Sequence, residues 1–180
     1  VLTQLRHRNA SVFITPTEAA FESLEDTLAP LAENLSISAF QTLFESEIAP
    51  SSGFDASLEE LLHLITENGY AYAYSNIFGE RTGTSIANAM DIARGGQFLT
   101  TPSSYPSTAW YTYDDSSCDY ACMVTEYFYW GLTSILGAQE NRPSDINHEW
   151  QLHTSSLVQT RDTNLYSLLT NSEYALPTNL

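Results

Sequence analysis

The chain of 180 residues contains no lysine, and its six arginines stand against 22 aspartates and glutamates, a formal net charge of −16. A surface that follows nucleic-acid phosphates needs clustered cations, so this composition argues against nucleic acid and anionic membranes as partners. The sequence also lacks an apolar run of the roughly 18 to 20 residues that span a bilayer, and Val1 does not open a charged-then-apolar leader. We therefore expect a mature, soluble chain without membrane insertion.

Three common catalytic motifs are missing: the G-x-S-x-G nucleophile turn, the phosphate-binding P-loop and the dinucleotide fingerprint. The H-E-x-x-H helix of zinc proteases matches only at Glu126, because Thr125 and Tyr129 occupy the histidine positions. His148 and His153 lie five residues apart, a spacing that does not put both side chains on one helical face. No motif therefore identifies a reaction.

Cysteine is scarce, with Cys118 and Cys122 as the only two. An even cysteine count in an acidic, lysine-free chain rich in Ser, Thr and Tyr is typical of an extracellular protein. A separation of four residues on a helical turn places the two Cα atoms about 6 Å apart, within the range of a disulfide. We therefore predict a local disulfide in a secreted protein, with two buried thiols or a metal site as alternatives.

Two N-x-S sequons begin at Asn9 and Asn34, and neither has proline in the middle position. In a eukaryotic secretory protein both asparagines are candidate glycosylation sites, which would make the chain a glycoprotein. In a bacterial protein the same tripeptides carry no such meaning.

Hydrophobic residues make up 43% of the chain and charged residues only 16%, a composition that favours folding over disorder. Residues 119–138 are apolar around nearly the whole circumference of a helix, which is typical of a central, buried helix. Caps and amphipathic patterns predict further helices that begin at Thr15 and near Leu157 and that cover residues 38–48, 57–68, 85–94, 145–153 and 164–170. The predicted fold class is mainly α with a small β element (α+β), with helices packed around the central helix.

The β element is predicted in two segments. Residues 11–15 are β-prone, so we expect residues 1–15 to form an N-terminal arm or edge strand, followed by a single globular domain over residues 16–180. Tyrosines alternate with small residues between Gly69 and Gly79, which predicts a strand with all the rings on one face. The aromatic, Ser- and Thr-rich residues 97–117 are expected to form a long, ordered surface loop.

Glu126 is the only charged residue between Cys122 and Gln139, inside the helix expected to be buried. A buried carboxylate costs several kcal/mol unless it is paired or protonated, so we expect a compensating partner, either an arginine or tyrosine hydroxyls. Glu126 is our candidate general acid or base, or metal ligand. A structural ion pair, or a side chain that reaches solvent at a groove, is the alternative.

Three carboxylates gather before that helix, at Asp114, Asp115 and Asp119. Hard oxygen ligands of this kind suit calcium, the one cofactor that the sequence suggests, although the spacing is not that of an EF-hand. A helix N-terminus also favours acidic residues electrostatically, so capping explains the same cluster without an ion.

Aromatic side chains form two sets that could present a contact surface, because tyrosine and tryptophan join an apolar face to a polar tip. Half-buried rings that line a core are the alternative for both sets. The candidate contact residues are Tyr70, Tyr72, Tyr74, Trp110, Tyr111 and Tyr113, with Tyr105 close to the second set.

Taken together, these features suggest an extracellular structural or interaction module whose partner is a protein, either itself or another, or a carbohydrate. Self-assembly would use the N-terminal arm, since an unpaired strand edge recruits another strand and Arg6 and Arg8 would be drawn to an acidic neighbour. The alternative function is a hydrolase-like or degenerate hydrolase-like domain with Glu126 as acid or base in an aromatic-lined groove.

Overall fold

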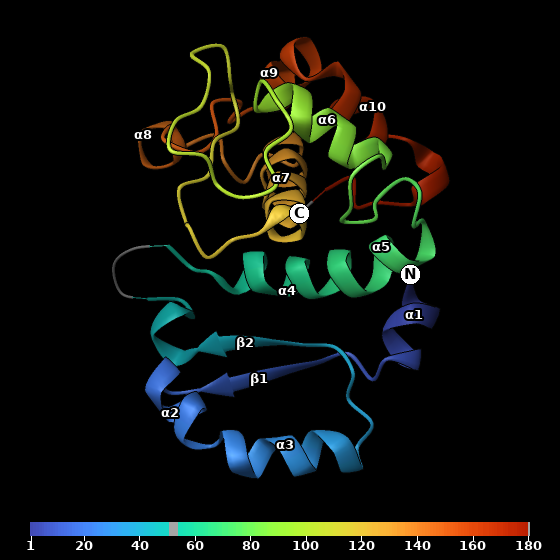
Figure 1. Ribbon diagram of the computed structural model, residues 1–180, viewed down its shortest axis with the longest axis vertical. Helices are drawn as coiled ribbons and strands as arrows, with labels where there is room; N and C mark the ends of the chain where they lie inside the picture. Colours follow the sequence, from blue (N-terminus) through green and yellow to red (C-terminus); the bar gives the residue numbers. More distant parts are fainter. Residues whose placement is uncertain (51–53, 180) are drawn as a thin grey trace. The chain divides into compact units, whose positions relative to one another are not determined.

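The computed structural model describes residues 1–50 and 54–179. The chain divides into two compact units, Val1–Tyr74 (unit 1) and Ser75–Leu180 (unit 2), and each is described by itself. Most of the regular structure is helical, and the sheet found among the described residues has two strands (Figure 1). This confirms the predicted α+β class with a small β element.

Unit 1 is built on a parallel pair of strands, β1 (Ser11–Thr15) and β2 (Phe40–Phe44), with Ser11 opposite Phe40 and Thr15 opposite Phe44 (Figure 1). Parallel strands cannot be joined by a tight hairpin, and here α2 (Glu18–Ser23) and α3 (Glu25–Asn34) form the connection. The remaining elements of unit 1 are α1 (Leu2–His7), the 3-10 turn η1 (Glu45–Glu47), α4 (Ser57–Ile65), the π-helical turn η2 (Thr66–Tyr70) and α5 (Ala71–Ala73).

The helix predicted over residues 38–48 is wrong, because residues 40–44 form β2. Phe40, Thr42 and Phe44 are β-prone and alternate with Gln41 and Leu43, so the segment fits a pleated strand once β1 supplies a partner. Leu43 is buried, and the side-chain amide of Gln41 donates a hydrogen bond to a carboxylate oxygen of Glu60 on α4. The predicted arm, residues 1–15, therefore contains α1 and β1 and pairs with β2 of its own chain.

The strand predicted between Gly69 and Gly79 is also wrong, since α4 continues through η2 into α5. Tyr70 and Tyr74 are four residues apart, and their rings stack 6.2 Å apart, as neighbours on one helical face do. Alanine at positions 71 and 73 favours a helix, and no neighbouring strand is available there among the described residues.

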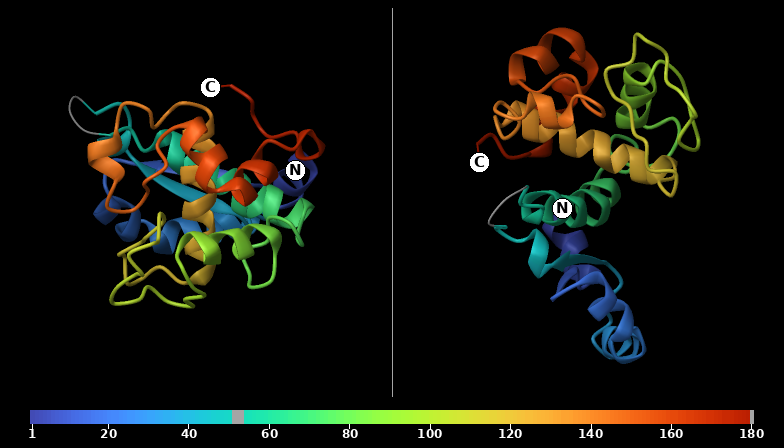
Figure 2. Two further views of the ribbon diagram at one scale, coloured as in Figure 1. Left: turned by 90° about the horizontal axis from the view of Figure 1, so that it is seen from above. Right: turned by 90° about the vertical axis from the view of Figure 1, so that its left-hand side faces the viewer.

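Unit 2 is organised around α7 (Tyr120–Ile135), as the apolar residues 119–138 predicted. The helices α6 (Ser85–Ala93), α9 (Ser155–Arg161) and α10 (Thr163–Leu169) contact α7, and α10 also contacts α6 (Figure 2). Two short elements complete the unit, α8 (Pro143–Ile146) and the 3-10 turn η3 (Ser172–Tyr174). A side-chain Cβ at Gly131 of α7 would clash with Leu165 of α10, so glycine permits the close approach of these helices.

Three aromatic rings form the centre of the core of unit 2. Tyr111, Tyr127 and Trp150 are fully buried, and their ring centroids lie 5.3 to 6.3 Å apart in tilted or edge-on pairs. The Trp150 indole nitrogen donates to Ser134 Oγ and to the Leu152 carbonyl, both at 2.9 Å. The Tyr111 hydroxyl donates to the Met123 carbonyl and the Tyr127 hydroxyl donates to Asp162, so each buried ring has a hydrogen bond at its polar tip.

Within the described residues, no helix combines the length and hydrophobicity that a bilayer span needs.

Candidate functional site

A large hollow of unit 2 lies along the loop between α6 and α7, and we call it the loop groove. It has a volume of about 720 Å³, within the range of about 300 to 1,000 Å³ typical of ligand sites. Most of its lining residues carry a hydroxyl, amide, imidazole or carboxyl group. The lining comprises Thr101, Pro102, Ser103, Ser104, Tyr105, Pro106, Ser107, Ala109, Thr112, Tyr113, Asp114, Ser116, His148 and Gln151.

Backbone hydrogen bonds hold the second half of this loop against the segment that precedes α9. Residues Tyr111 and Trp150 form an antiparallel β-bridge. The amide of Thr112 donates to the Glu149 carbonyl at 2.7 Å, and the amide of Gln151 donates to the Trp110 carbonyl at 3.0 Å. This bridge brings His148 and Gln151 to the groove from a distant part of the sequence.

The first half of the loop is fixed by side chains to the same groove wall. Tyr105 donates its hydroxyl to the Tyr113 carbonyl at 2.9 Å, and Thr101 donates to the Asp115 carbonyl at 2.8 Å. Burial raises the pKa of the Tyr105 hydroxyl, so this group stays a donor at neutral pH. The loop is therefore ordered, as its aromatic composition predicted.

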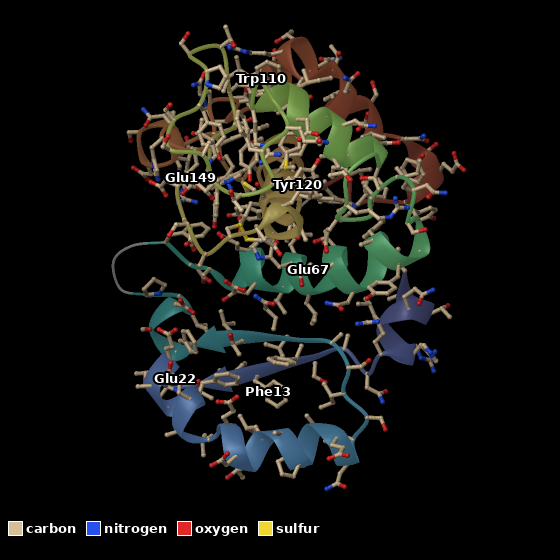
Figure 3. All side chains as sticks on the ribbon, in the orientation of Figure 1. Phe13, Glu22, Glu67, Trp110, Tyr120 and Glu149 are labelled. Atoms are coloured by element: carbon tan, nitrogen blue, oxygen red, sulfur yellow. A yellow bond between two sulfur atoms is a disulfide. The ribbon has the colours of Figure 1, made fainter. Side chains whose placement is uncertain are left out.

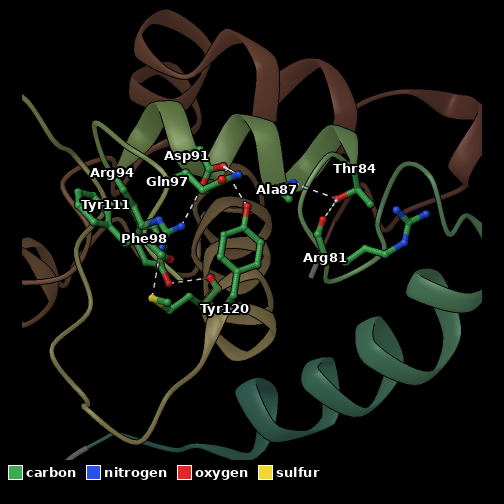
Figure 4. Close-up of polar contacts among 10 residues, drawn as sticks. Arg81, Thr84, Ala87, Asp91, Arg94, Gln97, Phe98, Tyr111 and Tyr120 are labelled. Atoms are coloured by element: carbon green, nitrogen blue, oxygen red, sulfur yellow. Dashed lines mark hydrogen bonds and ion pairs between the residues drawn. The ribbon is translucent and has the colours of Figure 1, made fainter. Parts of the chain in front are cut away.

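An ion pair anchors the start of the loop to α6 and α7 (Figure 4). Arg94 is fully buried, and its guanidinium donates to Asp91 at 2.8 Å and to the Phe98 carbonyl at 3.1 Å. Tyr120 of α7 also donates to Asp91, at 3.0 Å, and burial together with this carboxylate raises the pKa of Tyr120 to about 12. The charge of the buried arginine is thus compensated by a carboxylate and a carbonyl.

A buried carboxylate, Asp162, holds the loop at Trp110. Asp162, at the start of α10, accepts hydrogen bonds from the Tyr127 hydroxyl at 2.6 Å and from the Trp110 indole nitrogen at 2.8 Å. Its other oxygen accepts the amide of Leu165 at 3.1 Å, which caps the helix. Burial raises the pKa of Asp162, and the bonds from Tyr127 and Trp110 offset part of that rise.

The predicted aromatic contact residues fall into different environments. Tyr113 lines the loop groove, whereas Trp110 is half-buried with its nitrogen bound to Asp162 and the Arg161 guanidinium over its ring. Tyr111 is a correction: it is fully buried and donates its hydroxyl to the Met123 carbonyl at 2.8 Å, so it belongs to the core rather than to a surface.

The other predicted set, Tyr70, Tyr72 and Tyr74, lies in unit 1 and does not share one face, because the segment is helical. Tyr70 is buried and Tyr72 is exposed, with the Arg8 guanidinium 4.2 Å from its ring centre. A flat platform of three rings is therefore not formed.

Cys118 and Cys122 have their sulfur atoms at disulfide-bonding distance and their Cα atoms 5.4 Å apart. The bridge spans the last loop residues and the first turn of α7. It is local, as the spacing predicted, and it fixes the point where the groove loop enters the helix.

The three aspartates proposed for calcium are used differently from one another. Asp119 caps α7 by accepting the Cys122 amide at 3.0 Å, and Asp115 accepts the amide and hydroxyl of Ser117 at 2.8 and 2.7 Å. The Ser117 bonds lower the pKa of Asp115. Asp114 lines the loop groove. Helix capping accounts for Asp119 and a local turn with Ser117 accounts for Asp115, whereas calcium stays a prediction.

Glu126 lies among the buried positions of α7, as expected. It is not one of the residues that line the loop groove. The neighbouring Thr125 donates its hydroxyl to Glu80 at 2.9 Å. The negative charge of Glu126 adds to the effect of burial in raising the pKa of Tyr111. A role of Glu126 in catalysis stays a prediction.

The two sequon asparagines differ in their contacts. Asn9 has a positive φ of 46°, and its side-chain nitrogen donates to the Leu35 and Ser36 carbonyls at 3.0 and 3.2 Å. Asn34 is exposed at the end of α3. A glycan on Asn9 would use the nitrogen that makes these bonds, so Asn34 is the more accessible acceptor.

Sequence reasoning missed most of the groove lining. The Ser, Thr and Pro content of residues 97–117 predicts a surface loop, but it does not predict that the loop lines a groove. No sequence pattern predicts His148 and Gln151 as groove residues, because they reach the groove through the β-bridge between Tyr111 and Trp150.

No protein-family model matches the chain, and neither a curated protein nor a solved structure matches it significantly.

Proposed function

We propose that this chain is an extracellular binding module whose loop groove holds a neutral carbohydrate. The observation that carries the proposal is the lining of the groove, where serine and threonine hydroxyls, the Gln151 amide and the His148 imidazole accompany two tyrosines and one carboxylate. Tyrosine rings offer an apolar face to the C–H face of a sugar, and hydroxyl, amide and carboxylate groups offer donors and acceptors to its hydroxyls.

The charge of the groove supports a neutral ligand over an anionic one. Among the described lining residues there is one carboxylate, Asp114, and no arginine. Phosphate and sulfate groups are bound by arginine clusters or by backbone nests, so an anion would meet a repulsive carboxylate here without an arginine to compensate it. His148, the one histidine of the described lining, already has the carboxylate of Glu149 3.5 Å from its Nε2.

The same lining supports binding rather than glycoside hydrolysis. Hydrolysis by most glycosidases uses a pair of carboxyl groups about 5 to 10 Å apart, one on each side of the scissile bond. Asp114 is the one carboxylate among the described residues that line the groove, so the pair is incomplete. We base no activity on Glu126, which lies outside this lining.

An extracellular location is part of the proposal. The cysteine pair at bonding distance fits an oxidising compartment, and so does the acidic, lysine-free composition.

The experiment is calorimetric titration of the full chain with a panel of neutral oligosaccharides, together with an anionic uronic-acid oligomer of matched length. We expect one or more neutral members to bind. Tyr113→Ala should weaken that binding about three- to tenfold, because the ring supplies a stacking face. Tyr166→Ala, which removes a half-buried tyrosine of α10 outside the groove, is the matched control and should leave affinity unchanged.

A second pair of variants tests the carboxylate. Asp114→Asn should reduce affinity for the neutral ligand, whereas Asp145→Asn, at an exposed position on α8, should not. The proposal is wrong if no neutral oligosaccharide binds, if the uronic-acid oligomer binds best, or if the groove variants and their controls behave alike.

Self-association through residues 1–15 has less support than ligand binding. β1 already pairs with β2, and Arg8 is bound to Asn68 and to the Ser38 carbonyl at 3.2 and 3.1 Å. Of the two arm arginines, Arg6 is the exposed one. Light scattering of the full chain at high concentration tests this second possibility, and a monomer at every concentration would end it.

A further inference from the structure

Unit 1 contains a second hollow, which we call the apolar groove, between the sheet and the helices that connect its strands. Its walls are Phe13, Phe21 and Phe40 and, on α3, Leu28, Ala29 and Ala32, and its volume is about 270 Å³. An apolar cavity of about 150 Å³ already holds a benzene ring, so this groove has room for large apolar side chains of a partner. The Phe13 side chain lies between β1 and α3 (Figure 3).

The groove is apolar but poorly covered. Neither α2 nor α3 contains a buried residue, and Phe40 is 50% exposed. The three phenylalanine rings pack on one another with centroids 5.4 to 6.5 Å apart, and a hollow of about 270 Å³ stays open beside them. Exposed apolar surface of this kind marks interaction sites in soluble proteins.

The surroundings of the groove are strongly acidic. Five exposed carboxylates lie on α2 and α3, and residues 9–62 contain no arginine, lysine or histidine. Their positions are Glu18, Glu22, Glu25, Asp26 and Glu33, of which Glu25 lines the groove itself. A partner must therefore bring apolar side chains together with positive charge.

We propose that the apolar groove docks a cationic amphipathic helix of another protein, with its apolar face in the groove and its basic residues beside the carboxylates of α2 and α3. Helices bind in grooves of this type through apolar side chains one turn apart. Charge complementarity favours this occupant over a second copy of the chain, because two copies with a charge of −16 each would bring two acidic rims together.

The test uses a model peptide of about 18 residues, long enough to form a helix, built from leucine on one face and lysine on the other. Two further peptides control for chemistry: one has glutamate in place of lysine, and one has the leucine–lysine composition in a scrambled order without an apolar face. Binding to the full chain is measured by fluorescence anisotropy, and circular dichroism checks the fold of each variant.

Two residues of α3 give a matched pair for the apolar contact. Leu28 lines the groove, whereas Leu31 is exposed on the same helix outside the lining. Leu28→Ala should weaken binding of the leucine–lysine peptide, and Leu31→Ala should not.

Two triple variants separate the acidic rim from the net charge of the chain. Glu22→Gln/Glu25→Gln/Asp26→Asn removes three rim charges, and Glu140→Gln/Asp145→Asn/Glu173→Gln removes three exposed charges from unit 2. Because each triple changes the net charge equally, the rim triple should weaken binding at least about threefold more than its control.

Specific binding of the leucine–lysine peptide with both differences would support the proposal. It is overturned if that peptide does not bind, if the scrambled or glutamate peptide binds as well, or if each variant matches its control. A dimer of the full chain that Leu28→Ala dissociates would also overturn it, in favour of a second copy as the occupant.

Discussion

At the scale of single residues, Asp162 connects the core of unit 2 to the loop that forms the groove. Its carboxylate accepts three donors, from Tyr127, Trp110 and Leu165. We predict that Asp162→Ala lowers the free energy of unfolding by about 2 to 4 kcal/mol, because it leaves buried donors without an acceptor. Chemical denaturation measures the change.

A second cap residue serves as the comparison for that prediction. Asp119 caps α7 with one hydrogen bond to the Cys122 amide and is exposed. Asp119→Ala should cost about 1 kcal/mol, the usual cost of a lost cap. Equal losses for the two variants would mean that Asp162 acts only as a cap.

The raised pKa of Asp162 gives a prediction with a definite sign. In the folded state this carboxyl binds its proton at a higher pH than in the unfolded state, so its contribution to stability is fully present below the unfolded pKa and is lost as pH rises through the folded pKa. The wild type should therefore gain stability relative to Asp162→Asn as pH falls from about 7 toward 4. Denaturation of both proteins at each pH measures the difference, and a constant difference would contradict the assignment.

Buried tyrosines predict how the protein behaves in alkali. Burial raises the pKa of Tyr111 and Tyr127 well above the ordinary value, and Tyr120 has a pKa of about 12. Above pH about 10 the unfolded chain loses these protons first, so stability falls as pH rises. Phenolate absorbance should show some of the 11 tyrosines ionising in the folded protein and the rest only on unfolding. Ionisation of all of them before the loss of far-ultraviolet circular dichroism would refute this.

At the scale of elements, the disulfide and the Asp119 cap act on the same turn of α7. Removing the bridge with Cys118→Ser/Cys122→Ser should lower stability by only about 1 to 2 kcal/mol, because the closed loop is very short. Thermal unfolding measures the change, and hydrogen exchange should report faster opening of the first turn of α7 rather than of the whole helix. Two thiols labelled in the unreduced, denatured protein would show that no bridge had formed.

The elements that the sequence predicts well are those whose pattern is long. The residues of α7 are apolar on nearly every side over several turns. A pattern of that length is typical of a buried helix and too long for a strand. The alternation of Tyr70, Tyr72 and Tyr74 is too short to distinguish a period of two from a spacing of four. The backbone of those residues is helical, and the stacked rings of Tyr70 and Tyr74 follow from it. β2 was predicted as a helix because Ser38 and Gln41 resemble a capping box and its partner β1 lies far away in sequence.

At the scale of the whole molecule, the charge of −16 predicts a dependence on salt. Like charges repel in the folded chain, and salt screens that repulsion. Raising the ionic strength from about 0.01 to 0.15 M should raise the melting temperature by about 2 to 4 °C, which corresponds to about 1 kcal/mol. Calorimetric scans at the two ionic strengths measure it, with sucrose as a control for general solute effects. A lower melting temperature in salt would mean that the ion pairs of Arg94 and Arg142 outweigh the repulsion.

The sequence predicts those residues of the candidate site that local composition marks. Tyr113 and Asp114 were candidates because they are aromatic and acidic within a loop of suitable composition. Tyr111, two residues away from Tyr113, has the same residue type, and its burial follows from packing against Tyr127 and Trp150. Local sequence does not predict whether a tyrosine is buried, because burial depends on which distant segment covers its side chain.

The parallel pairing of β1 with β2 determines when the sheet of unit 1 can form during synthesis. A hairpin forms from neighbouring residues, whereas Ser11 must wait for Phe40, and Thr15 for Phe44, with two helices between them. During synthesis, which proceeds from the N-terminus, β1 and the Phe13 ring leave the ribosome before β2 exists to pair with them. The early segment is therefore exposed for as long as the ribosome takes to translate and release the residues of α2, α3 and β2, and its protection in that interval depends on the rate of elongation.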